Sequence, residues 1–152
     1  MQPEIRERPA FWVLGVPATL DPLTADWPTL WATKFGPRMP EIAPFASEPN
    51  GYGMFFCDTG HERLVDFLAA MVVPAETVAP PGLTLRAAPA AREAVFQTTL
   101  AELGPTWLRV FQEWLPGSTY DWDQSAPCYE RYAVGAGQPD SAVTIHVAVR
   151  PR

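Results

Sequence analysis

The chain has 152 residues, enough for one domain or for two small halves that share a core. Apolar residues make up 47% and charged residues 18%, a composition that excludes a chain disordered throughout. The net charge is −6, Lys34 is the only lysine and no basic run is present, which argues against nucleic acid as a direct partner and favours cationic ligands.

The sequence predicts neither secretion nor a membrane anchor. The apolar run near the N-terminus is too short for a signal peptide, and no stretch approaches the roughly 18 apolar residues of a membrane span. We therefore expect a cytoplasmic protein in which Cys57 and Cys128 are free, buried thiols. No Cys and His cluster has metal-ligand spacing and no glycine-rich phosphate loop is present, so we expect no metal and no cofactor.

The first half predicts a strand, a helix and two more strands. The first strand covers residues 8–18. The helix is capped by Asp26 and ends at Gly36 and Pro37. Its apolar face consists of Trp27, Leu30, Trp31 and Phe35. The half closes with strands at 51–58 and 63–73, although the pattern of the second also allows a short helix.

The second half repeats this order after a turn at 80–82. Residues 83–99 form a strand broken at Pro89, and "GPTWLRVFQEWLPG" (104–117) forms a helix with proline at both ends. Its apolar stripe consists of Trp107, Phe111, Trp114 and Leu115. The last strands, 128–134 and 141–151, are joined by a turn rich in glycine.

Because both halves have this order, we predict an α+β fold made of two strand-helix-strand-strand units, at about 8–79 and 80–152. A pseudo-twofold axis would relate the two units within a single domain, 1–152. Two sheets or two halves of one sheet would pack about this axis. We expect ligands in the cleft between the halves.

Glu130 is the most informative polar residue. It lies in the strand-like stretch "APCYERYAV" (126–134), where side chains alternate between two faces. Cys128 and Tyr132 share the face of Glu130, whereas Tyr129 and Arg131 lie on the other face. A carboxylate therefore lies on an apolar face, and Arg131 is not placed to pair with it. The alternatives are a solvated surface carboxylate and a functional group.

The block "FQEWLPGSTYDWDQSAPCYERY" (111–132) resembles the GyrI-like small-molecule-binding domain, which is also the effector-binding domain of AraC-type and MerR-type multidrug regulators. "TLWATKFGP" (29–37) and "GYGMFF" (51–56) resemble its first helix and the strand that follows. The resemblance implies a duplicated fold of the SHS2 type and a cleft in which Glu130 meets cationic aromatic ligands. The chain shows no helix-turn-helix and no basic patch, so we do not expect a DNA-binding regulator.

The resemblance, the aromatic content and the strand pattern together suggest a candidate ligand-binding set: Glu130, Tyr132, Tyr52, Trp31, Phe56, Phe67 and Trp114. For Trp31 and Trp114, a core role is the favoured alternative. Our leading hypothesis is a stand-alone protein that binds apolar, aromatic, cationic compounds. One alternative is a hydrolase of strained, cyclopropane-bearing natural products, with Glu130 and Tyr132 as catalytic residues. Another is an interaction module that modulates a regulator or a larger enzyme. The oligomeric state is not predicted.

Overall fold

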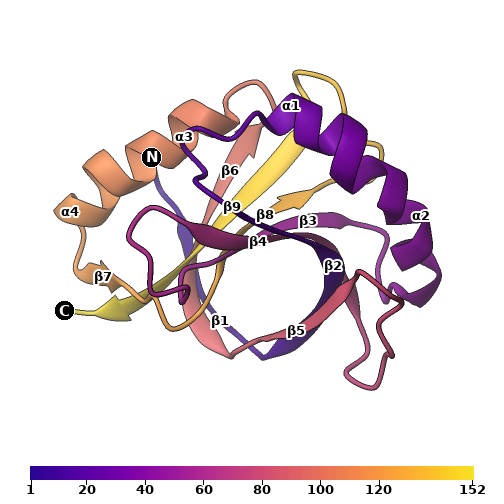
Figure 1. Ribbon diagram of the computed structural model, residues 1–152. Coiled ribbons are helices and arrows are strands. Elements are labelled where there is room, and N and C mark those ends of the chain that lie inside the picture. The colour runs from indigo at the N-terminus through magenta and orange to yellow at the C-terminus, as the bar shows by residue number, and fades with distance from the viewer.

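The computed structural model describes residues 1–152 and shows an antiparallel sheet with helices on one side (Figure 1). The strands are β1 (Glu4–Arg8), β2 (Phe11–Leu20), β3 (Gly51–Phe56), β4 (Val65–Val73), β5 (Thr84–Ala88), β6 (Ala91–Thr99), β7 (Tyr120–Trp122), β8 (Cys128–Tyr132) and β9 (Ala142–Pro151). The first helical segment, 27–45, consists of α1 (Trp27–Leu30), the π-helical turn η1 (Trp31–Phe35), the 3-10 turn η2 (Gly36–Arg38), α2 (Met39–Ile42) and the 3-10 turn η3 (Ala43–Phe45). The second helical segment, 103–117, consists of α3 (Leu103–Arg109), the π-helical turn η4 (Val110–Trp114) and α4 (Leu115–Gly117).

The strands form one continuous sheet rather than two. Its order is β1-β6-β9-β8-β3-β4-β2-β5, with β7 paired to β9, and every pair is antiparallel. The two halves of the chain meet where β3 pairs with β8. In that pair Gly53 lies opposite Glu130, and Phe55 lies opposite Cys128. The centre of the sheet is therefore also the join between the halves.

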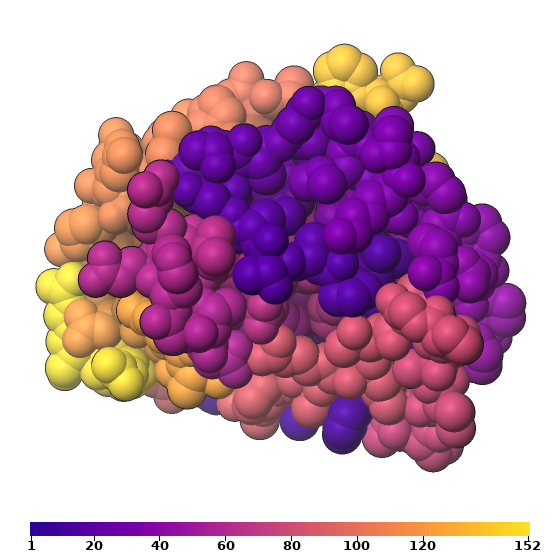
Figure 2. Space-filling view, viewed as in Figure 1, coloured from indigo at the N-terminus to yellow at the C-terminus, as the bar shows by residue number.

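Both helical segments pack on the same face of the sheet, and their purple and orange atoms cover the upper part of the molecule in Figure 2. Phe35 and Ile42 of the first segment are fully buried against β2 and β4. Val110 of the second is fully buried among residues of β6, β8 and β9. No helix in the structure combines the length and apolar character that a membrane crossing needs.

The predicted elements occur: one ambiguity is resolved, one helix is longer than expected and two strands are added. Residues 65–73 are a strand, β4, which resolves the ambiguity in the apolar pattern. The helix expected to end at Gly36 and Pro37 instead continues in short turns to residue 45, because proline is tolerated at the start of each new turn. β1 and β7 were not predicted: β1 is a charged stretch without strand-like alternation, and β7 has three residues. Cys57 and Cys128 are both free, and Cys57 is only half-buried.

Gly15 of β2 marks a close approach between strands, and we expect Gly15→Ala to destabilise the fold. A Cβ there would lie 2.8 Å from both the carbonyl oxygen of Ala69 and the Cβ of Ala70. The predicted loss in the free energy of unfolding is about 1–3 kcal/mol, the usual cost of overpacking. Chemical denaturation would measure it. Gly51→Ala is the control, since nothing lies within 4 Å of its added methyl group; equal effects of the two substitutions would contradict the close approach.

Candidate functional site

Glu130 of β8 is a buried carboxylate with two neutral hydrogen-bond donors. Its residue surface is only 7% exposed. The indole N–H of Trp107 donates to Oε2 at 2.7 Å, and the hydroxyl of Tyr132 donates to Oε1. None of the ion pairs in the structure includes Glu130. No positive side chain therefore compensates this carboxylate within the chain.

The central strand pair makes room for the carboxylate. Gly53 lies directly across from Glu130, and a Cβ at that position would lie 3.1 Å from Oε1 of Glu130 and 3.2 Å from the ring of Phe67. Tyr132 is two residues along β8 and so shares the face of Glu130. Trp107 reaches the same point from α3. The site is therefore assembled from both strands of the join and from the second helical segment.

Burial raises the pKa of Glu130 above the usual carboxyl range, although the hydrogen bonds from Tyr132 and Trp107 act in the opposite direction. Burial, followed by the charge of Glu130, raises the pKa of Tyr132 well above its usual value. Tyr132 thus remains a neutral donor at physiological pH. Glu130 can act as an acid when protonated, and as a base or an anchor for a cation when ionised.

Aromatic rings from both helical segments surround this carboxylate. Trp31 meets Tyr132 edge-on with ring centroids 6.2 Å apart, and Trp107 meets Phe55 at 5.6 Å. Phe55 in turn contacts Phe67 at 5.1 Å. We call Trp27, Trp31, Phe55, Phe67, Trp107 and Tyr132 the ring cluster.

The structure brings four of the seven candidate residues together: Glu130, Tyr132, Trp31 and Phe67. Tyr52 and Phe56 do not share their site. They alternate with Gly53 and Phe55 along β3, so they face the opposite side of the sheet, where the Tyr52 hydroxyl donates to Glu48 at 2.7 Å. Trp114 packs on Phe96, with ring centroids 5.1 Å apart, as part of the core.

Sequence reasoning did not select Trp107, Phe55 or Gly53. The sequence pattern places Trp107 only in an apolar helix stripe, although its position in the second helix matches that of Trp27 in the first. Phe55 and Gly53 depend on the register between β3 and β8, which joins residues more than 70 positions apart in the chain. No local pattern reports such a register.

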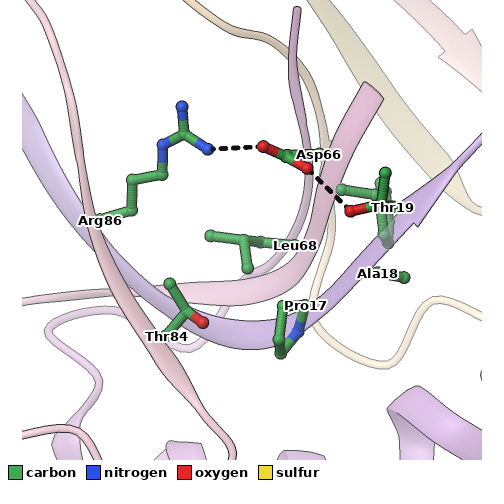
Figure 3. A pocket seen from close by; sticks show the side chains of 8 residues that line it. Pro17, Ala18, Thr19, Asp66, Leu68, Thr84 and Arg86 are labelled. Carbon is green, nitrogen blue, oxygen red and sulfur yellow. Dashed lines mark hydrogen bonds and ion pairs between the residues drawn. The ribbon is translucent and has the colours of Figure 1, made fainter. Parts of the chain in front are cut away.

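A separate hollow of about 240 Å³ lies beside the ring cluster. Figure 3 shows Asp66 between Thr19, whose hydroxyl donates to it at 2.9 Å, and Arg86, whose guanidinium lies 3.6 Å away. Phe67 of the ring cluster also lines this hollow. Glu130 lines neither this hollow nor a larger cavity on the opposite, helix-free face of the sheet, and it is buried in this conformation. No group of three or more His, Cys, Asp and Glu residues is placed to hold a metal ion.

Comparison with known proteins identifies one family. The model of the GyrI-like small-molecule-binding domain matches residues 1–150. No curated protein matches the chain in a sequence search.

Solved structures share the fold at low sequence identity. The structure of SAV2435 bound to tetraphenylphosphonium has a TM-score of 0.76 and 10% identity, over 99% of this chain and 94% of that one. The C-terminal domain of EcmrR has a TM-score of 0.70 and 12% identity, over 99% and 98%. A hydrolase from Listeria innocua has a TM-score of 0.56 and 12% identity, over 98% and 92%.

The raised pKa of Glu130 predicts that Glu130→Gln stabilises the protein increasingly as pH rises. A raised folded-state pKa favours the protonated form, so the stability it contributes is present below the ordinary carboxyl pKa and is lost as pH rises through the folded pKa. The amide stays neutral throughout. The variant should therefore gain about 1.4 kcal/mol over the wild type for each unit by which folding raises the pKa.

Denaturation of both proteins between pH 4 and pH 9 would measure this difference. Glu113→Gln, at an exposed carboxylate of η4, is the matched control and should show no such trend. A difference between Glu130→Gln and the wild type that does not change with pH would contradict the raised pKa.

Proposed function

This chain belongs to the GyrI-like small-molecule-binding domain family, and on that premise we propose that it binds apolar aromatic compounds, preferentially cationic ones, beside Glu130. The bound compound would lie between the sheet and the two helical segments. The observation that carries the proposal is a buried carboxylate, without an internal cation, among the rings of both halves. We propose that the protein is cytoplasmic and binds its ligand there.

The chemistry of the ring cluster suits such a ligand. A cation placed over an aromatic face is stabilised by about 0.5–2 kcal/mol of interaction free energy, with the larger values at desolvated sites. The flat rings of Trp31, Trp107 and Phe55 offer apolar surface, and Glu130 offers the one negative charge. A bound cation would favour the ionised form of Glu130 and lower its pKa. Neutral compounds would gain the apolar contacts alone.

Binding requires the site to open. Both carboxylate oxygens of Glu130 already accept a hydrogen bond, from Trp107 and from Tyr132. A ligand cation that contacts the Glu130 carboxylate must displace one of these donors or pass beside it. We propose that Trp107 moves, because it belongs to the helical segment, whereas Tyr132 is held in β8 between β3 and β9.

We also propose that the two halves are duplicated units about a pseudo-twofold axis, with this site between them. The sheet order supports it: exchanging β1 with β5, β2 with β6, β4 with β9 and β3 with β8 leaves the order unchanged when it is read from the other edge. Each helical segment also has a π-helical turn directly after its first α-helix. Superposition of residues 8–79 on 80–152 would test this; a fit no better than that of unrelated units would oppose it.

The binding proposal predicts that tetraphenylphosphonium binds at micromolar levels or tighter and quenches tryptophan fluorescence. Glu130→Gln should lower the affinity for this cation roughly tenfold or more, because the ligand loses its only charge partner. The neutral triphenylphosphine oxide presents similar rings, and its affinity should fall less than about threefold in the same variant. Calorimetry on both ligands would measure these ratios.

The matched control is Glu113→Gln, which removes the same charge from the exposed side of the second helical segment. It should leave both affinities within about twofold of the wild type. Equal losses for the cation and the neutral compound in Glu130→Gln would show that Glu130 supports the shape of the site rather than charge recognition.

The second candidate is a hydrolase of strained, cyclopropane-bearing compounds at the same site. The raised pKa of Glu130 supports it, because a buried carboxyl of that kind is suited to proton transfer, and a hydrolase is among the similar folds. Ionised Glu130 would take a proton from water as the water oxygen bonds to a ring carbon. The breaking carbon–carbon bond would leave its electrons on the substrate, which then accepts that proton from Glu130.

If the chain is a hydrolase, a cyclopropane-fused aromatic compound should be consumed over many turnovers, with one water added per product in mass spectrometry. Glu130→Gln should reduce the rate by roughly 100-fold or more while binding persists, because the amide is not a base. Tyr132→Phe should reduce it less, if the hydroxyl only orients the reactants. Stoichiometric binding without product would remove the hydrolase candidate for this substrate class.

A further inference from the structure

An open cavity of about 460 Å³ lies on the helix-free face of the sheet, within the size range of ligand pockets. Residues from β1, β2, β3, β4, β6, β8 and β9 line it, so the sheet itself forms most of the wall. Aromatic side chains supply part of the surface, namely Phe11, Tyr52 and Tyr129. This cavity lies on the opposite side of the sheet from Glu130 and shares no lining residue with the ring cluster.

Positive charge is concentrated here in a chain whose net charge is −6. Three of the eleven Lys and Arg residues line this one cavity, namely Arg6, Arg8 and Arg131. Long-range attraction from an acidic protein favours cations. A local gathering of guanidinium groups therefore calls for its own explanation.

A buried glutamate accounts for only part of this charge. Glu93 of β6 is 1% exposed and accepts hydrogen bonds from Arg8 Nε at 2.9 Å and Arg6 Nε at 3.1 Å. Burial opposes ionisation, but hydrogen bonds from His146 and Arg8 hold the pKa of Glu93 below its usual range. Two guanidinium groups share this carboxylate, which leaves an excess of one positive charge. Burial lowers the pKa of His146, so this ring stays neutral and adds none.

Arg8 has a nitrogen that nothing in the protein satisfies. Its side chain is 8% exposed; Nε binds Glu93 and Nη1 donates to the carbonyl of Pro9 at 3.0 Å, but Nη2 has no hydrogen-bond partner. The guanidinium lies 4.8 Å from the ring centre of Phe11 and 5.8 Å from that of Tyr129. Leaving a buried charged donor unpaired costs free energy, and an acceptor in the cavity would recover it once the guanidinium turned toward the cavity.

The other charged side chains at the cavity carry one positive and two negative charges. Arg131 Nε donates to the Tyr52 hydroxyl at 3.2 Å and lies 3.5 Å from Glu48. Glu48 also accepts from Tyr52 and from Asn50. Glu4 is exposed where β1 borders the cavity. The charged side chains around the whole cavity therefore sum to zero, and the positive excess is local to the Arg6 and Arg8 pair, with Glu4 offsetting it at the rim.

We propose that this cavity binds a small aromatic monocarboxylate. Its carboxylate would pair with Arg6 and Arg8, two guanidinium groups that share one carboxylate within the protein, and would accept hydrogen bonds from them. Its ring would pack against Phe11, Tyr52 and Tyr129. The ligand class is opposite in charge to that proposed at Glu130, and the two sites occupy opposite faces of β8.

The test uses 2-naphthoate and its neutral analogue 2-naphthylmethanol with the full chain. Calorimetry should give a submillimolar Kd for 2-naphthoate and weaker binding of the alcohol. Arg6→Gln should lower the affinity for 2-naphthoate about tenfold and leave the affinity for the alcohol unchanged. Arg92→Gln is the matched control, since Arg92 is also on the sheet, is similarly exposed, pairs with Glu7 and does not line the cavity; it should change affinity less than about twofold.

Amide chemical shifts of the wild type locate the site without any variant, in case Arg6→Gln does not fold. With 2-naphthoate, the amides of Gln97 and Thr144 at the cavity should move, and the indole N–H of Trp107 should not. Equal losses in Arg6→Gln and Arg92→Gln, equal affinity for the acid and the alcohol, shifts confined to the ring cluster, or no binding at millimolar concentration would each overturn the proposal.

Discussion

A carboxylate buried without a cation is the constraint on which the functional account depends. Desolvating a charge costs several kcal/mol unless a partner compensates it, and Glu130 has only an indole and a phenol. The chain accommodates it with Gly53 across the central strand pair and with rings from both helical segments. Burying this carboxylate lowers the stability of the fold. The arrangement is understandable if a ligand supplies the missing positive charge.

The alternation of side chains along β8 divides the molecule into two chemical environments. Glu130 and Tyr132 face the helices, where negative charge lies among rings. Tyr129 and Arg131 face the other side, where guanidinium groups outnumber the carboxylate that they share. A single strand thus contributes to both proposed sites, and the sheet would separate the two proposed ligands, which are opposite in charge.

Much of this account could be predicted from local pattern, and the remainder depends on long-range pairing. Strand alternation alone placed Glu130 on an apolar face and Arg131 on the other, and both placements hold in the structure. The register of β3 against β8, which sends Tyr52 and Phe56 to the opposite face, has no local signature. The pairing of Glu93 with Arg6 and Arg8 likewise joins β6 to β1, a strand whose charged sequence resembles a solvated terminus.

Direct titration of the Glu130 carboxyl is the most incisive measurement. Carbon-13 NMR of labelled glutamate side chains, with the resonance assigned through Glu130→Gln, would follow its ionisation with and without tetraphenylphosphonium. The account predicts a pKa above the usual carboxyl range in the free protein and a lower pKa once the cation is bound. A Glu130 that titrates in the usual range and does not respond to the cation would contradict its role as the anchor of the site.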